Sequence, residues 1–193
     1  FNKYYMRIKF NILDKNKISL SPSIKAKDLL ISFLDFIFKD QRNSYRNLYK
    51  SENCLAVSRS TLSLSIVCEY LKFFKNKKTI FIPDYICNES LSILRKNDTK
   101  IFFYDHSSID KKELKLKLQQ YKADIFLYVN YFGKKNNITK DLLSFIKKNE
   151  ITIIEDNAHC INSLNNNHSE IELYSPHKLF GLENGGIIKF KEK

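Results

Sequence analysis

From about residue 53 onward, hydrophobic and polar positions follow two alternating patterns. Short, nearly continuous apolar runs predict strands, and longer segments with apolar residues at helical spacing predict the helices between them. Continuous apolar strands that alternate with helices are typical of a mainly parallel sheet covered on both faces. The pattern therefore predicts an α/β domain with three α/β/α layers. Strands are expected over 54–58, 79–83, 100–105, 124–130, 151–156 and 185–193, and helices over 60–74, 88–97, 109–121 and 138–150.

Two segments are expected along the chain. Residues 1–50 are interpreted as an N-terminal helical segment, because apolar positions recur at helical spacing over 23–39. Residues 51–193 form the α/β domain. The chain begins with Phe1 and stops just after a predicted strand, so we expect a piece of a longer protein whose large domain is incomplete at its C-terminus.

The net charge of this 193-residue chain is +12 and is spread along the sequence. A basic excess suits nucleic acid or a phosphorylated ligand. No nucleic-acid-binding motif accompanies it, so we interpret it as a solvated basic surface and expect no nucleic-acid partner. The longest apolar run, 29–38, is short and carries Asp35. With no signal peptide either, a cytoplasmic protein without a membrane span is expected.

The four cysteines contain no CxxC pair. Zinc sites are usually built from closely spaced Cys or His ligands, so no metal is expected here. Buried, reduced thiols are the simplest interpretation, and Cys87 and Cys160 are expected to pack rather than to act as catalysts.

Candidate chemistry gathers where the predicted strands end. In open α/β sheets, ligands bind beyond the carboxyl ends of the strands. Ser58 or Ser60 is expected to cap the first helix of the domain. The segments that this rule brings to one edge are 58–61, 83–88, Asp105, 130–133 and 156–160.

Three parts of the sequence match what pyridoxal phosphate requires of a protein. A Ser/Thr-rich turn that opens a helix offers N–H groups and a positive dipole end to a phosphate. Asp156, at the end of a strand, can hold a protonated pyridine nitrogen, and Lys178 can form a Schiff base with an aldehyde. Each residue also has an ordinary alternative, since Asp156 could cap the next segment and Lys178 could be a solvated loop lysine.

Here the sequence resembles the DegT/DnrJ/StrS family of sugar aminotransferases, which are pyridoxal-phosphate enzymes of fold type I. No single motif is specific, but five occur in the family's order from about residue 53 to the C-terminus. The family patterns AVSSGTAAL, VIVPSFT, HLYG, IEDAAQ/H and S..K…GEGG are matched by AVSRSTLSL (56–64), IFIPDYI (80–86), NYFG (130–133), IEDNAH (154–159) and SPHKLFGLENGG (175–186).

The resemblance implies a role for each matched residue. Lys178 would form the Schiff base and then move the proton during amino transfer. Asp156 would pair with the pyridine nitrogen, and His159 would lie against the cofactor near its phenolic oxygen. The residues that would hold the phosphate are Ser60, Thr61 and Ser175. By the same resemblance, the fold is the large domain of fold type I, with a mixed seven-stranded sheet.

The chain also departs from the family pattern. Ser60 replaces a glycine in the phosphate turn, and Asn130 stands where histidine is common. Cys87 replaces the aromatic residue that often stacks on the cofactor ring, so Tyr85 or His159 is expected to compensate. Leu173 occupies the usual serine position before the lysine, which leaves Ser175 as a displaced candidate. A divergent subgroup is therefore expected.

The resemblance implies an aminotransferase that moves an amino group from an amino acid, expected to be glutamate, to a nucleotide-linked keto-sugar for surface polysaccharide synthesis. Members are homodimers. One alternative is a pyridoxal-phosphate lyase or dehydratase on the same scaffold, although the sugar dehydratase of this family carries histidine in place of the lysine. Another is an inactive fragment with a binding role.

Overall fold

A computed structural model describes residues 53–96, 98–107, 111–161, 168–180 and 182–191. The predicted N-terminal segment, its helix over 23–39 and the start of the helix predicted over 109–121 lie outside the described residues. The elements are β1 (Cys54–Val57), α3 (Ser60–Lys75), β2 (Thr79–Pro83), α4 (Asn88–Leu94), β3 (Lys100–Tyr104), α5 (Lys111–Gln120), β4 (Ile125–Val129), η2 (Tyr131–Gly133), α6 (Lys140–Lys148), β5 (Thr152–Asn157), β6 (Ile171–Tyr174), η3 (Pro176–Lys178) and β7 (Gly186–Phe190).

The strands form one mixed sheet of seven strands in the order β1-β7-β6-β5-β4-β2-β3. Strands β3, β2, β4, β5 and β6 run parallel, and β7 pairs antiparallel with both β6 and β1. The carboxyl ends of β1 and of the five parallel strands therefore meet at one edge. This confirms the expected α/β class and the seven-stranded sheet.

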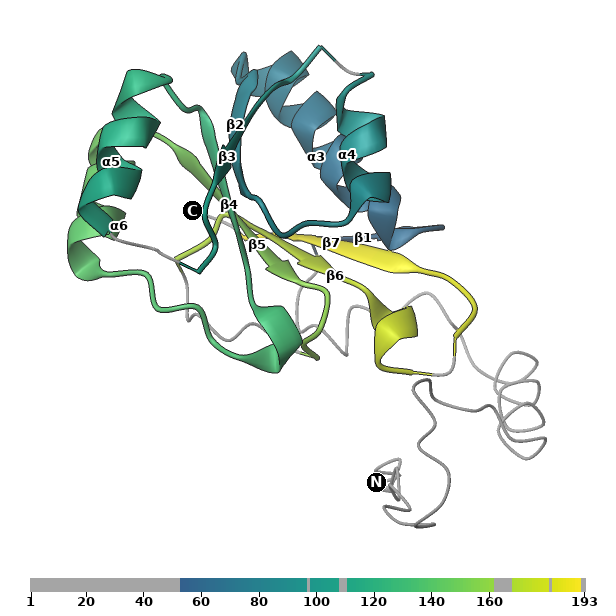
Figure 1. Cartoon of the computed structure of the whole chain (residues 1–193). Helices are drawn as coiled ribbons and strands as arrows, with labels where there is room; N and C mark the ends of the chain where they lie inside the picture. Colours follow the sequence, from purple (N-terminus) through teal and green to yellow (C-terminus); the bar gives the residue numbers. More distant parts are fainter. Residues whose placement is uncertain (1–52, 97, 108–110, 162–167, 181, 192–193) are drawn as a thin grey trace, which may run out of the picture.

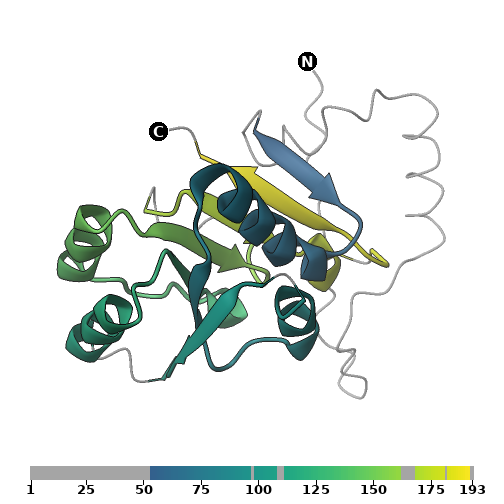
Figure 2. The ribbon, with the colours of Figure 1, turned by 90° about the horizontal axis from the view of Figure 1, so that it is seen from above.

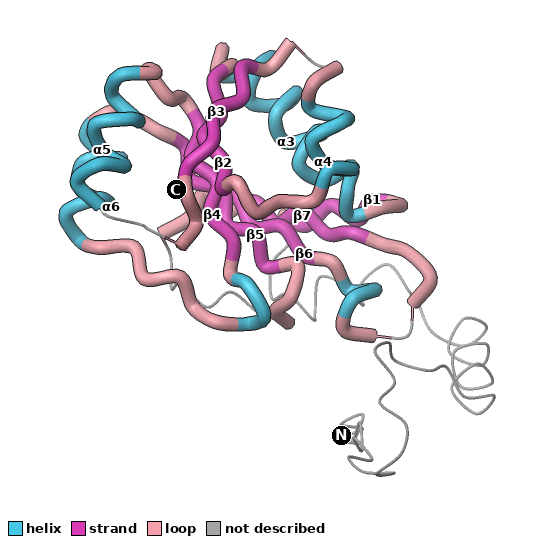
Figure 3. Tube along the Cα trace, viewed as in Figure 1, coloured by secondary structure: helices cyan, strands magenta, loops and turns pink. Residues whose placement is uncertain are grey.

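Helices cover both faces of the sheet, and Figures 1 and 3 show the strands between the two helical layers. On one face, α3 and α4 pack against side chains such as Leu127, Ile154 and Ile188. On the other face, α5 and α6 pack against side chains such as Phe126 and Ile153. Figure 2, seen from above, shows α3 lying along β7. Because β2 and β4 are fully buried, their side chains are apolar on both faces, as the sequence predicts.

The apolar pattern by itself did not identify β6. Its sequence IELY places Glu172 at the centre of the sheet, where the residue is fully buried. Lys191 Nζ and Lys189 Nζ lie 2.5 and 3.4 Å from the Glu172 carboxylate, and the Tyr174 hydroxyl donates to it at 2.8 Å. Burial raises the pKa of Glu172, but Lys191 outweighs it and leaves the pKa below its usual value. Lysines on the neighbouring β7 and just after it therefore allow an acid inside a strand.

The cap of α3 differs from the prediction. Neither Ser58 nor Ser60 occupies the N-cap position. Arg59 does, with an extended backbone and no side-chain hydrogen bond to the helix. Among the described residues, no helix has both the length and the apolar character needed to cross a membrane.

Candidate functional site

The N-terminus of α3 lies at the shared edge of the sheet without a side-chain cap. Its first turn carries no acidic residue, and partly buried Ser60 and Thr61 open it. Ser63 Oγ, one turn into the helix, is buried and has no hydrogen-bond partner among the described residues. Uncapped N–H groups, hydroxyls and the positive end of a helix together form a suitable environment for an anion.

Gly186 allows β7 to approach this helix terminus. A Cβ atom at Gly186 would lie 2.6 Å from Ser60 Cα and 2.9 Å from Ser60 N, closer than real Cβ contacts. The preceding Gly185 forms a bridge with Arg59 and has φ +133°. Gly185 is therefore required for its backbone conformation, and Gly186 is required because no side chain fits beside Ser60.

Lys178 ends the short helix η3, which follows β6 at the same edge. Ser175, the N-cap of η3, is buried, and its carbonyl accepts from the Lys178 N–H at 3.0 Å. His177 Nδ1 lies 3.1 Å from the Gly185 carbonyl, which can only accept, so the imidazole donates and ties η3 to the start of β7. Lys178 itself is exposed, and among the described residues its ammonium forms no ion pair. The turn is held by its neighbours while the lysine side chain remains available.

Asp156, near the end of β5, lies on the same face of the sheet as α3. It follows Ile154 by two residues, and Ile154 packs in the α3 layer of the core. Its Oδ1 accepts from the Ala158 N–H at 2.9 Å, which fixes the carboxylate. Burial raises the pKa of Asp156, and the Ala158 N–H and the charge of Lys178 offset this rise only in part. Asp156 is thus a partly buried carboxylate that a cation would stabilise.

His159, three residues further, is held in one orientation. The N–H of Phe132 donates to His159 Nδ1 at 3.2 Å, and the Phe132 ring stacks on the imidazole at 5.6 Å between centroids. Burial lowers the pKa of His159, and the charge of Lys178 lowers it further. The neutral ring therefore accepts at Nδ1 and carries its proton on Nε2.

A buried polar network fixes the loop that holds His159. Asn130 is fully buried, and its Nδ2 donates to Glu155 Oε1 at 2.8 Å and to Asn157 Oδ1 at 2.7 Å. Its Oδ1 accepts from the Asn136 N–H at 2.9 Å, and Ser169 Oγ donates to Glu155 Oε2 at 2.9 Å. The asparagine that departs from the family pattern thus ties the end of β4 to the end of β5.

Tyr85 does not lie against His159. Its ring stacks on His106 at 5.2 Å and 30°, and its carbonyl accepts from the Tyr131 hydroxyl at 2.5 Å. The expectation that Cys87 packs in the interior is wrong, because Cys87 is the N-cap of α4 and is exposed there. Leu173 packs in the core, so the serine position before the lysine offers no polar group here. The ring-stacking contact expected of Tyr85 remains a prediction, whereas Phe132 is an aromatic residue beside His159 that the sequence analysis did not single out.

Cys160 behaves as the sequence predicted. It is buried, its Sγ lies 3.8 Å from the Asn130 carbonyl, and burial raises its pKa to about 11. A thiol that stays protonated at neutral pH is a poor nucleophile. Cys160 therefore packs between β4 and β5.

The structure also brings together three residues that the sequence left apart. Asp84, Asp105 and His106 follow the paired strands β2 and β3, and their ligand atoms lie within 4.8 Å of one another. The sequence offered a weak signal, since each residue directly follows a predicted strand at the functional edge. Their polar groups already bind one another and the local backbone, with Asp84 on His106 and Asp105 on Ser107.

Comparison with solved structures identifies the fold. A putative sugar aminotransferase, Spr1654 from Streptococcus pneumoniae, matches over 91% of this chain and 53% of its own, with TM-score 0.69 and 14% identity. The fold is that of the sugar aminotransferases. Helicobacter pylori PseC, an aminotransferase of pseudoaminic acid biosynthesis, matches over 91% and 52% (TM-score 0.69, 15% identity). CalS13 from Micromonospora echinospora, also a sugar aminotransferase, matches over 91% and 55% (TM-score 0.71, 12% identity).

These comparisons confirm the resemblance at the level of fold. The chain spans about half the length of the solved structures it matches. No family model and no curated protein matches the sequence. Similarity is therefore retained in the sheet and its connections while the sequence has diverged.

Proposed function

We propose that this chain is the cofactor-binding part of a pyridoxal-phosphate-dependent aminotransferase. One observation carries the proposal: Asp156 on β5, Lys178 in the turn after the neighbouring parallel strand β6, and the N-terminus of α3 without a side-chain cap all lie at one edge of the sheet. A fixed carboxylate, an available lysine and an open helix terminus are the groups that this cofactor requires. Spr1654 has been solved in PLP and PMP forms on the same fold, which supports the proposal.

The residues present fit the cofactor. Asp156 is a partly buried carboxylate whose pKa desolvation raises, so a cation beside it would stabilise its charge, and the space beside Ser60 exists because Gly186 has no side chain. When bound, pyridoxal phosphate supplies an electron-withdrawing pyridinium ring and an aldehyde carbon. The N–H groups at the start of α3 and the hydroxyls of Ser60 and Thr61 would hold the phosphate, and buried Ser175, the N-cap of η3, is a further candidate at this edge.

Each polar group would then have a defined part in holding the cofactor or in moving a proton. The Asp156 carboxylate accepts from the protonated ring nitrogen and keeps its charge in place. Lys178 Nζ would hold the cofactor through its aldehyde carbon, and its amine would take up and return the proton that amino transfer moves. His159 would donate from Nε2 to the phenolic oxygen of the cofactor, because its Nδ1 already accepts from the Phe132 N–H.

We further propose that the substrates are an amino-acid donor, glutamate, and a nucleotide-linked keto-sugar destined for a surface polysaccharide. Sugar aminotransferases among the structural matches support a sugar substrate. The family resemblance supports a homodimer in the cytoplasm.

An absorption spectrum tests the proposed cofactor chemistry. Addition of pyridoxal phosphate to the purified protein is expected to give a visible Schiff-base band that borohydride removes. Peptide mapping after reduction should then find the modification on Lys178. If the modification lies on other surface lysines, or if no band forms, the proposed function is wrong.

The Gly-Gly pair gives a second test. Gly186→Ala is expected to weaken pyridoxal-phosphate binding about tenfold or more and to lower the free energy of unfolding by about 1–3 kcal/mol, because the new methyl group displaces Ser60. Gly185→Ala is the matched control. It strains a backbone with φ +133°, at a cost of about 1–3 kcal/mol, but its methyl group has no atom within 4 Å.

Cofactor titration and urea unfolding of both variants separate the two effects. Only Gly186→Ala is expected to lose affinity while both lose stability. Equal loss of affinity in both would show that general destabilisation, and not the space beside Ser60, controls cofactor binding.

A further inference from the structure

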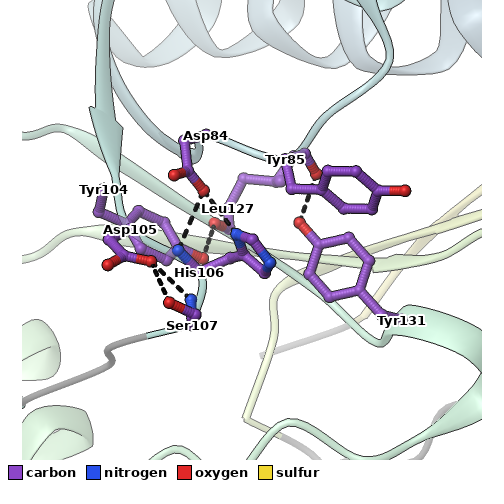
Figure 4. Close-up of polar contacts among 8 residues, drawn as sticks. All are labelled: Asp84, Tyr85, Tyr104, Asp105, His106, Ser107, Leu127 and Tyr131. Atoms are coloured by element: carbon purple, nitrogen blue, oxygen red, sulfur yellow. Dashed lines mark hydrogen bonds and ion pairs between the residues drawn. The ribbon is translucent and has the colours of Figure 1, made fainter.

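A second group of side chains lies beside the proposed cofactor site, at the carboxyl ends of β2, β3 and β4. Asp84 directly follows β2, His106 comes two residues after β3, and Tyr131 begins η2 after β4. Strand β2 pairs in parallel with both β3 and β4, so these three ends are neighbours. Figure 4 shows that Tyr85, Tyr131, His106 and Asp84 converge there.

The His106 ring is fixed on several sides. Asp84 Oδ1 accepts from the His106 backbone N–H at 3.1 Å and lies 2.7 Å from the ring Nδ1. Tyr85 stacks on one face of the ring, and Tyr131 meets it edge-on at 5.5 Å and 64°. A carboxylate can only accept, so Nδ1 carries a proton, and in the neutral form of such a ring Nε2 is a hydrogen-bond acceptor. In Figure 4 this second nitrogen points away from Asp84, on the side of Tyr131.

These groups are open to a ligand. Tyr85 is 59% exposed, and the side chains of His106 and Asp84 are 36% and 50% exposed. A solvent-exposed carboxylate–imidazole pair contributes little to folding stability. Its effect is instead to present an oriented acceptor next to an exposed aromatic ring. That combination suits a hydroxylated ring, whose C–H face packs on the tyrosine and whose O–H group donates to the imidazole.

Tyr131 connects this group to the proposed cofactor site. Burial raises the pKa of Tyr131, and the negative charges of Asp156 and Asp84 raise it further. A carboxylate from each of the two sites therefore contributes to this pKa. The next residue, Phe132, stacks on His159. Tyr131 and Phe132, which are adjacent in η2, therefore contact His106 and His159 respectively.

We propose that Tyr85 and His106, with Asp84 as the group that orients the imidazole, form a subsite for the sugar ring of the substrate. This rests on the proposed function and deepens it. The carbonyl carbon of the sugar would have to reach the amino group that the bound cofactor carries, so the sugar is the part of a sugar nucleotide that must lie beside the cofactor site. His106 Nε2 accepts a hydrogen bond from a sugar hydroxyl, and the exposed surface of Tyr85 supports the ring.

The test measures binding of sugar nucleotides that carry no keto group and therefore do not react. The probes are UDP-glucose, dTDP-glucose and GDP-mannose, each compared with its own nucleoside diphosphate by calorimetry on the protein loaded with pyridoxal phosphate. His106→Ala is expected to raise the Kd of the tightest sugar nucleotide about tenfold and to leave the Kd of the matching nucleoside diphosphate unchanged. His106→Gln, which keeps an acceptor, is expected to recover part of the loss.

His168→Ala is the matched control, because it removes another exposed histidine from a turn away from these strands. Equal weakening of the sugar nucleotide and the nucleoside diphosphate would place the base or phosphates on this surface and overturn the proposal. So would an unchanged Kd, failure of all three probes to bind, or binding that a chelator abolishes, since that would assign Asp84, Asp105 and His106 to a metal. The Schiff-base band separates the two proposals: without it the proposed function fails, and with it only the subsite fails.

Discussion

Replacement of Lys178 with alanine is expected to lower the rate of amino transfer by at least roughly 10³-fold, since one side chain serves as both nucleophile and proton carrier. The lysine is exposed at the end of η3, and η3 is held by the Ser175 carbonyl and the His177 contact with Gly185. The substitution should therefore change the free energy of unfolding by no more than about 0.5 kcal/mol. Single-turnover amino transfer, followed with the cofactor already bound, measures the effect.

Two further variants make the result specific. Lys178→Arg keeps the positive charge next to Asp156 but lacks a primary amine, so it should be as inactive as alanine. Lys134→Ala removes another exposed lysine at the same edge of the sheet and should retain activity. Activity that survives in Lys178→Ala and falls in Lys134→Ala would show that Lys134, and not Lys178, supplies the catalytic amine.

Most of the fold could be predicted from periodicity alone. The buried parallel strands have apolar runs such as TIFIP and IFLYV, and the helices between them have apolar residues on one side, so each pattern selects its own structure. Strand β6 could not be predicted in this way because Glu172 interrupts its apolar character. The lysines that neutralise this acid lie on and just after β7, and only the sheet order brings them there.

The candidate site was predictable where it depends on strand ends and not where it depends on strand order. Asp156 and the turn before α3 could be placed at one edge from the α/β alternation alone. The Asp84–His106 pair needs β2 beside β3, and the contact between Gly186 and Ser60 needs β7 to return antiparallel beside β1. The N-cap prediction for α3 failed because serine is a frequent cap, whereas here Arg59 bridges to Gly185 and leaves the helix terminus open.

Asp156→Asn is expected to lower the rate of amino transfer by roughly 10²- to 10³-fold, because an amide cannot stabilise the protonated ring nitrogen by charge. The isosteric side chain keeps an oxygen that can accept from the Ala158 N–H, so the local turn should persist. Pyridoxal phosphate should still bind through its phosphate and Lys178. Single-turnover amino transfer again measures the effect. Asn157→Asp is unsuitable as a control, because Asn157 accepts from Asn130 in the buried network. Asp105→Asn, an exposed acid at the same edge, is the matched control.

The same substitution should stabilise the protein when pyridoxal phosphate is absent. Burial raises the pKa of Asp156 in the folded chain, so the folded state holds a proton that the unfolded state releases. Folding stability from this group is present at acid pH and is lost as the pH rises from the usual carboxylate range, about 3.9, through the raised value. At pH 7 the wild type therefore carries the cost of a buried charge, and Asp156→Asn does not. Thermal unfolding should give a higher midpoint for the variant at pH 7 and a smaller difference near pH 4. A variant less stable than the wild type at pH 7 would mean that the carboxylate already has its counter-charge within the protein, which would remove the reason for a cationic ring beside it.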